Sequence, residues 1–405
     1  MSTHTAPVGL LVVGGGPAAH SAAIAYREQG GEGSVLVVSD DDTPPYFRPA
    51  LTKDHLRGES SEAELLLAPD RPDGVEIRTG RTVGTLSPAE YRARLDDGTT
   101  IDYRQCVLAT GATPTQLPVP GAENGLYLRY LADARTLHER IGPARSVVVV
   151  GSGFIGCEAA VSMVRRGLEV TVCSNERNPQ ATRLGDAVGD RLAEWLRAEG
   201  VRFRSGAEVT GIESTTDRQV VHVRDGDPAG ADVVLVAAGI TPRAGLAAEA
   251  GVPVEQDRVV VDEHMRSTVD GVLAAGDVAL ARNAAAGRHL AVEHWGEAEA
   301  MGRIAGTTAA GGDAVWDSPP GFWTEIGDRV LKYAAWGDGF DEVALATHGD
   351  GGFTAWYQRA GLLVGVATHL ADDDFERGAD LVRRNATSSA GPGTPDTTSP
   401  VDVPG

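Results

Sequence analysis

The chain has few lysines, few cysteines and no long apolar segment. Lysine stands only at positions 53 and 332 of the 405 residues. The three cysteines, Cys106, Cys157 and Cys173, form no C-x-x-C pair and no metal-ligand spacing, so we expect small buried packing residues and no metal site. This use of cysteine, without a secretory signal, predicts a reducing, cytoplasmic location.

Positive charge is also scarce. The formal net charge of −21 argues against nucleic acid and against anionic membranes as partners. No apolar run approaches the ~20 residues of a membrane helix, so we expect no membrane span. Charges are largely screened beyond ~10 Å at 0.1 M salt, so a local basic patch could still bind an acidic protein.

Glycine is abundant, and the first of two ordered clusters lies near the N-terminus. Residues 8–13 form an apolar run, and Gly14-Gly15-Gly16-Pro17-Ala18-Ala19 follows it before a helix-forming segment. Gly14 permits a sharp turn, Gly16 lets the backbone approach a pyrophosphate, and Ala19 lets the helix pack on the strand. A second strand ends at Asp40, where an acid can bind a ribose hydroxyl. The pattern predicts a dinucleotide site.

Residues 43–52 form a proline-rich loop. Pro44, Pro45 and Pro49 favour an extended backbone. Tyr46, Phe47, Arg48 and Lys53 are expected to project from this loop. The segment is either a rigid surface loop or a loop against a flat aromatic cofactor, with Arg48 and Lys53 near its polar edge.

The segment after this loop is predicted to be rich in strands. Residues 75–80, 92–98 and 99–104 alternate as antiparallel strands do, with a turn at Asp97-Gly98. An apolar strand then ends at Ala109-Thr110-Gly111. Prolines at positions 114, 118 and 120 mark a domain boundary.

Residues 145–166 repeat the opening motif. Gly151-Ser152-Gly153-Phe154-Ile155-Gly156 follows an apolar strand, and Glu158 lies in the helix that comes next. Two copies with correct flanks predict two nucleotide-binding folds. The second strand is followed by Ser174 and Asn175, with Arg177 close by. An acid there would favour NAD, and an arginine leaves room for a 2′-phosphate, so both nucleotides stay open.

Fewer motifs mark the rest of the chain. An amphipathic helix is predicted at 185–200, and a short strand stops at Gly276-Asp277, where open α/β sheets place ligands or where Asp277 caps a helix. Five of the six tryptophans lie after position 294. Alternating segments there predict an antiparallel sheet with a helix at 373–384, and a disordered tail follows at 386–405.

Taken in order, these motifs resemble those of the FAD-dependent pyridine-nucleotide ferredoxin reductases that serve oxygenases and cytochromes P450, of the putidaredoxin-reductase type. The similarity to apoptosis-inducing factor is more distant. The resemblance covers residues 7–385. Its carriers are both glycine clusters, residues 46–53, 109–111 and 274–277, Glu293-His294-Trp295 and Phe322-Trp323. Ala50 and Thr52 replace the usual proline and serine, and Ser174 replaces the usual acid.

The resemblance implies an α/β fold with two Rossmann-like dinucleotide-binding domains, one inserted in the other, and a small C-terminal α+β domain. The FAD-binding domain would comprise residues 6–113 and 240–313, the NAD(P)-binding domain 114–239 and the C-terminal domain 314–385.

The resemblance also assigns roles to individual residues. Lys53 and Glu158 would form a salt bridge near flavin N5, and Trp295 and Trp323 would flank the flavin ring. Asp40 would bind the adenosine ribose of FAD. The other residues predicted to bind a cofactor are Gly14, Gly16, Ala18, Ala19, Arg48, Val83, Ala109, Thr110, Gly111, Gly151, Gly153, Phe154, Ile155, Gly156, Ser174, Arg177, Gly239, Gly276, Asp277, Glu293 and His294.

The implied function is hydride transfer from NADH or NADPH to FAD, followed by single-electron transfer to a ferredoxin-type iron–sulfur protein, in a monomer or homodimer. Positioning supplies most of the catalysis, and the Lys53 cation would stabilise charge on the reduced flavin. A disulfide reductase is excluded because no redox cysteine pair is present. A cysteine-independent NAD(P)H oxidase, a quinone or small-radical reductase, and a flavin redox sensor remain as alternatives.

Overall fold

The computed structural model describes residues 7–67 and 73–387, and the first glycine cluster joins a sheet to a helix as predicted. The sheet has the order β3-β2-β1-β6-β5-β4, with β18 on the other side of β6. Strands β1, β2, β3, β6 and β18 are parallel, and β4, β5 and β6 are antiparallel. The bounds are β1 Val8–Val13, β2 Val35–Val38, β3 Val75–Arg78, β4 Val83–Ser87, β5 Arg92–Leu95, β6 Thr100–Leu108 and β18 Val272–Ala274.

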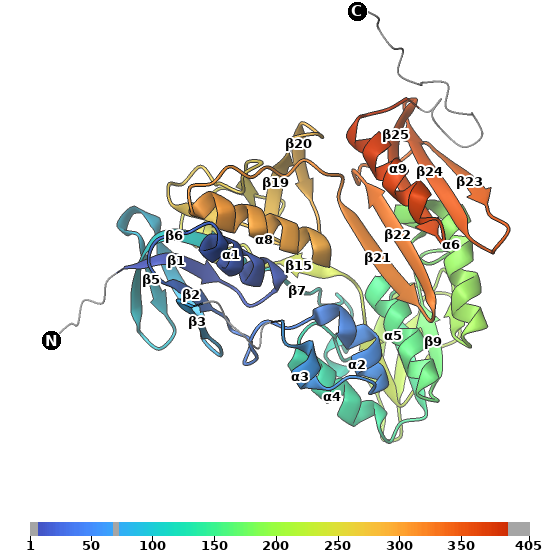
Figure 1. The fold of residues 1–405 in the computed structure, drawn as a ribbon. Coiled ribbons are helices and arrows are strands. Elements are labelled where there is room, and N and C mark those ends of the chain that lie inside the picture. Colours follow the sequence, from blue (N-terminus) through green and yellow to red (C-terminus); the bar gives the residue numbers. More distant parts are fainter. Residues whose placement is uncertain (1–6, 68–72, 388–405) are drawn as a thin grey trace, which may run out of the picture.

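Helices α1 (Pro17–Glu28) and α8 (Trp295–Ala309) lie side by side against this sheet (Figure 1). The chain order reverses between β1 and β6, and open α/β sheets bind ligands at such a point. Two predictions for this region are wrong. β3 pairs in parallel with β2 and is not part of the antiparallel group, and the segments 99–104 and 106–108 are one continuous strand, β6.

The second glycine cluster belongs to a four-stranded parallel sheet of order β10-β9-β8-β14. Its strands are β8 Ser146–Val150, β9 Glu169–Cys173, β10 Arg202–Arg204 and β14 Val233–Val236. The helices beside it are α4 Leu131–Ile141, α5 Phe154–Arg165 and α6 Ala181–Ala198. Helix α6 starts earlier than predicted and is interrupted at Gly185, whose φ is +78°. The two parallel sheets confirm the predicted α/β class.

Smaller sheets connect these units. Strands β7 and β15 pair antiparallel at residues 112–114 and 240–242, next to the predicted boundaries of the inserted domain. The division into domains stays a prediction, and this pairing is consistent with it. The remaining elements of this region are β11 Val209–Ser214, β12 Gln219–Val223, β13 Ala229–Ala231, α7 Gly245–Glu249, β16 Val254–Glu255, β17 Arg258–Val261, β19 Ala279–Asn283 and β20 Arg288–Ala291.

The loop at 43–52 is not extended throughout. Residues Arg48–Thr52 form a 3-10 helix, since Pro49 fits the first turn of a helix, and two short helices follow. These are α2 Asp54–Arg57 and α3 Glu62–Leu65. Tyr46 does not project: it is buried, accepts a hydrogen bond from the Leu131 N–H and donates one to Asp41.

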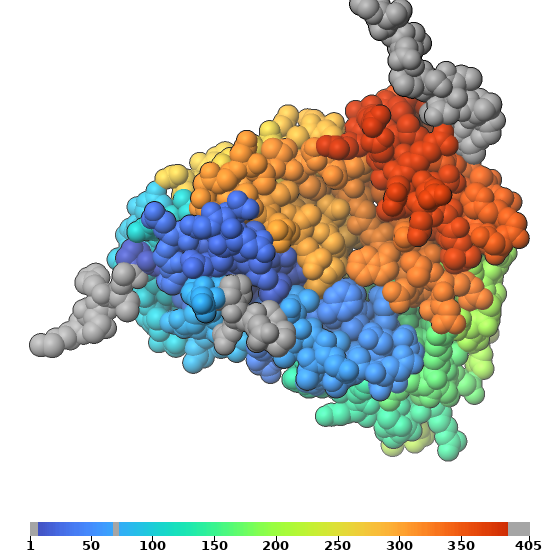
Figure 2. Space-filling view, viewed as in Figure 1, coloured from blue at the N-terminus to red at the C-terminus, as the bar shows by residue number. Residues whose placement is uncertain are grey.

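The C-terminal part is a five-stranded antiparallel sheet with α9 (Asp372–Arg383) packed on it. The strands are β21 Gly321–Ile326, β22 Arg329–Ala335, β23 Glu342–Thr347, β24 Phe353–Arg359 and β25 Leu362–His369. The other face of the sheet shares a core with α5 and α6, and Figure 2 shows the C-terminal segment in red and orange packed against the green one. Most of the predicted disordered tail, 388–405, lies outside the described residues.

Candidate functional site

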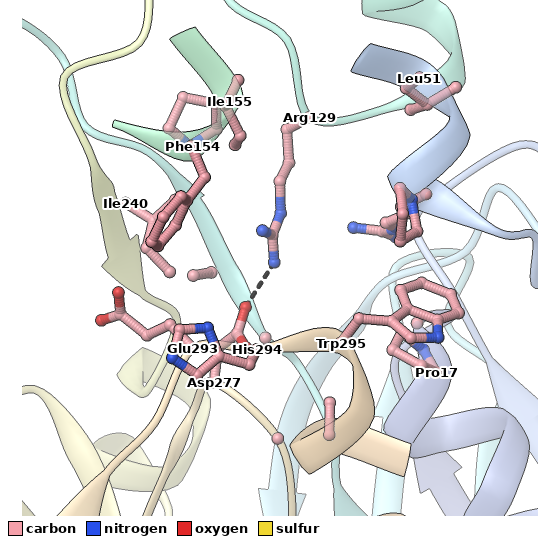
Figure 3. A pocket seen from close by; sticks show the side chains of 18 of the residues that line it. Pro17, Leu51, Arg129, Phe154, Ile155, Ile240, Asp277, Glu293, His294 and Trp295 are labelled. Carbon is pink, nitrogen blue, oxygen red and sulfur yellow. Dashed lines mark hydrogen bonds and ion pairs between the residues drawn. The ribbon is translucent and has the colours of Figure 1, made fainter. Parts of the chain in front are cut away.

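A cavity of about 360 Å³ lies where the two glycine clusters face one another. This volume is typical of small-molecule sites. Figure 3 shows Phe154 and Ile240 on one side of the cavity, Leu51 and Trp295 on the other, and Arg129 reaching between them. Residues from both parallel sheets and from the C-terminal sheet therefore line one continuous space.

The first glycine turn (Gly14-Gly15-Gly16) can be made only by glycine at its first position. Gly14 has φ +131°, and a Cβ there would lie 2.0 Å from the carbonyl oxygen of Ala109. A Cβ on Gly16 would meet no atom within 4 Å. Among the described residues no side chain caps the first turn of α1, so its N–H groups are free to bind an anion in the cavity.

Asp40 lies at the edge of the cavity beside an arginine that the motifs did not identify. Arg243 donates a hydrogen bond of 2.6 Å to Asp40. Arg243 stands just after β15, where no glycine pattern marks it. The carboxylate keeps further lone pairs for a ribose hydroxyl.

Two further arginines, Arg48 and Arg129, have unpaired N–H groups that an FAD molecule in the cavity could use. The Nε atoms of Arg48 and Arg129 are buried and have no hydrogen-bond partner among the described residues. Arg129 also donates a hydrogen bond of 2.5 Å to Asp277, the dashed line in Figure 3. Asp277 caps no helix, because β19 follows it, so the capping alternative is wrong. Unpaired guanidinium N–H groups beside an open glycine turn fit a ligand with pyrophosphate and carbonyl oxygens, as FAD has.

Lys53 and Glu158 come from opposite sides of the cavity and meet. Their Nζ and Oε2 atoms are 2.7 Å apart, and both side chains are buried. Thr52 donates to Glu158 Oε2 at 2.6 Å and Thr324 donates to Oε1 at 2.7 Å. Thr52 thus supplies the hydroxyl of the usual serine. The carboxylate is held by partners from the 3-10 helix Arg48–Thr52 and from β21, so the pair connects three parts of the chain.

The second glycine turn (Gly151-Ser152-Gly153) repeats the geometry of the first. Gly151 has φ +105°, and a Cβ there would lie 2.3 Å from the carbonyl oxygen of Ala237. Phe154 and Ile155 follow at the start of α5 and line the cavity. Arg183, another cavity residue, stacks over the Phe154 ring at 5.8 Å from its centroid.

Aromatic side chains close the cavity on the C-terminal side. The Phe322 ring lies 4.3 Å from Phe154 and 4.7 Å from His294, centroid to centroid. Burial, aided by the charge of Arg183, lowers the pKa of His294 to about 3, so the imidazole is neutral at physiological pH. Trp295 packs edge-on against Phe47, whereas Trp323 is 37% exposed at the cavity mouth.

Most of the predicted site residues line this cavity, but six do not: Ala19, Val83, Gly151, Gly156, Ser174 and Arg177. Ala19 is buried in α1, and Gly156 is packed so closely on Gly151 that a Cβ would lie 2.3 Å from its carbonyl oxygen. Both therefore act in helix–strand packing. Val83 is buried in β4.

Two other members of this set, Ser174 and Arg177, follow the end of β9. Ser174 is buried, and its Oγ is 2.6 Å from Ser152 Oγ. Arg177 is exposed on the loop that follows.

Several cavity residues were not predicted from the sequence. Arg129 and Tyr130 precede α4, Arg243 follows β15, and Gln180 and Arg183 lie at the start of α6. They belong to connecting segments that have no motif. The only available signal was an arginine close to a strand or helix end, and arginine is too common in this chain to single these positions out.

The cysteines are not placed for redox chemistry. All three are free and buried, and burial raises the pKa of Cys106 to about 12. Within residues 7–67 and 73–387 no group of three or more histidine, cysteine or acidic residues could hold a metal. Over the same residues no helix is both long and apolar enough to cross a membrane.

Comparison with known proteins gives a consistent set of matches. The family model of the pyridine nucleotide–disulphide oxidoreductases matches residues 9–302. Rhodocoxin reductase of Rhodococcus erythropolis is 31% identical over 349 residues, which are 85% of this chain and 82% of the relative. Rubredoxin-NAD(+) reductase of Pseudomonas putida is 30% identical over 84% of this chain and 90% of its own length.

Solved structures agree over nearly the whole chain. The ferredoxin reductase for the CYP199A2 system from Rhodopseudomonas palustris has a TM-score of 0.87 at 28% identity, covering 94% of this chain and 96% of that one. The reductase in a covalent putidaredoxin reductase–putidaredoxin complex has a TM-score of 0.86 at 27% identity, covering 93% of both chains.

Proposed function

The chain belongs to the pyridine nucleotide–disulphide oxidoreductase family, and from this premise we propose that it passes electrons from NADH or NADPH through FAD to a ferredoxin-type iron–sulfur protein of an oxygenase or cytochrome P450 system. It is an oxidoreductase that uses FAD and a nicotinamide nucleotide. The absence of a cysteine pair sets it apart from the disulfide-reducing members that the family name describes.

One observation carries the proposal: a single cavity is lined by the first glycine turn and by Gly153 of the second. FAD, when bound, accepts a hydride and releases electrons singly, which a nicotinamide does not do. Gly14, Gly16, Arg48 and Arg129 would hold FAD, and Gly153 with Phe154 would hold the nicotinamide nucleotide. The chain then contributes binding and orientation, which suffice for a hydride transfer between two cofactors.

Lys53 and Glu158 are the proposed catalytic residues. Lys53 is a fixed cation at the cavity wall, where it would stabilise negative charge that develops during reduction. Glu158 fixes the ammonium group, and its remaining oxygen is held by Thr324. Because the pair is already in place, little reorganisation is needed when the nucleotides bind.

The location and the partner follow from the same set of observations. We place the protein in the cytoplasm, since three free cysteines are typical of a reducing compartment. The net charge of −21 opposes an acidic partner at long range, so contact with an acidic ferredoxin would depend on local cations within about 10 Å. A monomer or homodimer stays the prediction.

The direct test is reduction of cytochrome c by the purified holoenzyme, with and without an added small ferredoxin. We expect the rate to depend strongly on the ferredoxin. As a matched pair, Lys53→Ala should abolish most of this rate, whereas Lys332→Ala, which removes the other lysine, should not. Nucleotide consumption that ignores several different ferredoxins, with peroxide as product, would instead establish an oxidase. A slow turnover with a persistent reduced flavin–nucleotide complex would establish the redox sensor.

A further inference from the structure

The loop after β9 lies where the second nucleotide fold would meet the adenosine ribose, and it differs from the corresponding loop of the first fold. The correspondence follows from backbone hydrogen bonds. Gly14 N–H donates to Val38, and Gly151 N–H donates to Cys173. One residue after those acceptors comes Ser39 in the first fold and Ser174 in the second.

The match extends two residues further. Ser39 Oγ accepts from the Asp41 N–H at 3.1 Å, and Ser174 Oγ accepts from the Glu176 N–H at 3.1 Å. Asp40 of the first fold therefore corresponds to Asn175 of the second. The position that holds a carboxylate in one half holds a neutral amide in the other.

The acid nearest to Asn175 is already engaged. The Glu176 carboxylate accepts a hydrogen bond of 3.0 Å from the N–H of Thr182, in the first turn of α6. The N-terminus of a helix stabilises a negative charge, so this position favours the Glu176 carboxylate. One oxygen of the Glu176 carboxylate is thus engaged at the start of α6.

Cations, by contrast, are available beside Asn175. Arg177 is exposed and makes no hydrogen bond or ion pair with any described residue. Arg204 ends the neighbouring strand β10, and its carbonyl accepts the Ser174 N–H at 3.0 Å. Its guanidinium donates to the Asp227 carbonyl and so keeps other N–H groups free.

We infer that this protein takes NADPH in preference to NADH, with the 2′-phosphate bound by Arg177 and Arg204 next to Asn175. This inference rests on the proposed function, in which the second fold holds the nicotinamide nucleotide. Guanidinium groups bind phosphate through directed, charge-assisted hydrogen bonds, whereas an acid at this place would repel it. The chain's overall negative charge opposes the phosphate only weakly, because distant charges are screened.

The inference is tested by binding, without turnover. Isothermal titration of the holoenzyme with 2′,5′-ADP and with 5′-ADP isolates the 2′-phosphate from the nicotinamide. We expect 2′,5′-ADP to bind at least about tenfold more tightly than 5′-ADP, because charge-assisted hydrogen bonds to a phosphate commonly have an effect of this size. Arg177→Ala should remove most of that difference and leave 5′-ADP unchanged.

The control removes another exposed arginine, from the strand next to β9. Arg202 is paired with Glu169 and lies two residues before the end of β10. Arg202→Ala should leave both affinities as they were. Equal affinities for the two nucleotides in the unaltered protein, or a preference for 5′-ADP, would overturn the inference.

The outcome can be separated from that of the proposed function. A preference for 2′,5′-ADP in a protein that reduces no ferredoxin would leave this inference standing and remove the proposed acceptor. Strong ferredoxin reduction supported equally by NADH and NADPH, with equal affinities for the two ADP probes, would leave the proposed function standing and overturn this inference.

Discussion

The two glycine turns share one backbone geometry, but the side chains after their second strands have diverged. In each turn the first glycine has a positive φ and lies close to a backbone carbonyl oxygen. A Cβ added at Gly14 would lie 2.0 Å from that oxygen, and a Cβ added at Gly151 would lie 2.3 Å from it. Asp40 lies at the cavity edge and pairs with Arg243, whereas its counterpart Asn175 is uncharged.

This difference separates two kinds of constraint. The turn is fixed by sterics, because no residue with a Cβ fits where β1 meets β6 or where β8 meets β14. The second residue after the strand, Asp40 in one half and Asn175 in the other, is not fixed by these contacts. The shared geometry therefore follows from the fold, and the divergent position is where we expect the two halves to differ in the nucleotide they bind.

The largest effect is expected at the turn glycines. Gly14→Ala combines a strained φ with a contact of 2.0 Å, so we expect a loss of about 2–4 kcal/mol in the free energy of unfolding, together with loss of bound flavin. Urea unfolding and the flavin-to-protein absorbance ratio measure the two quantities.

Two companion variants make this test specific. Gly151→Ala should destabilise to a similar degree, but it should leave flavin binding intact if the two halves bind different nucleotides. Gly16→Ala should leave stability nearly unchanged, since its Cβ meets nothing within 4 Å. Normal stability and flavin content in Gly14→Ala would contradict the steric argument.

The same division decides which site residues could be predicted from the sequence. Residues fixed by the backbone, such as Gly14 and Gly153, were predictable because strand, turn and helix are local and periodic. Arg129 and Arg243 were not, since their place beside Asp277 and Asp40 depends on how distant segments pack. The resemblance to relatives suggested that Lys53 and Glu158 meet, which spacing alone could not give because the two lie 105 positions apart.

The cavity between the two halves offers a second test, at Lys53. Lys53→Ala removes the fixed cation next to Glu158, so hydride uptake should slow about 100-fold if that charge stabilises the transition state. The nucleotide dissociation constant should change much less. Anaerobic stopped-flow at several nucleotide concentrations gives both values, and Lys332→Ala is the control. An unchanged limiting rate would remove Lys53 from the mechanism.

A third test concerns His294, which lies where the halves meet the C-terminal sheet. Burial lowers the pKa of His294 to about 3, so below about pH 6.5 the unfolded chain binds a proton that the folded chain does not. Folded stability should therefore fall as the pH decreases from about 6.5 toward 3, by up to about 1.4 kcal/mol per pH unit. Above pH 6.5 this residue contributes no pH dependence.

The contribution of His294 is measured as a difference. Urea midpoints of the unaltered protein and of His294→Asn, recorded at pH 7, 6 and 5, should converge as the pH falls. His289→Asn, at an exposed histidine, should run parallel to the unaltered protein. Parallel curves for His294→Asn as well would show that the imidazole is solvated when flavin is bound.

The smallest effect, and the sharpest test of the comparison, comes from giving the second half the acid of the first. Asn175→Asp places a carboxylate where Asp40 stands in the other fold, so it should accept the ribose hydroxyls of NADH and repel the 2′-phosphate of NADPH. We expect the ratio of kcat/KM for NADH to that for NADPH to rise about tenfold, equivalent to about 1.4 kcal/mol.

Ser174→Glu is a weaker choice, because Ser174 is buried against Ser152 and the longer side chain must disrupt that contact. If Asn175→Asp leaves the ratio unchanged while Ser174→Glu shifts it, the two halves do not correspond residue by residue beyond the strand end. The nucleotide would then be recognised at Ser174.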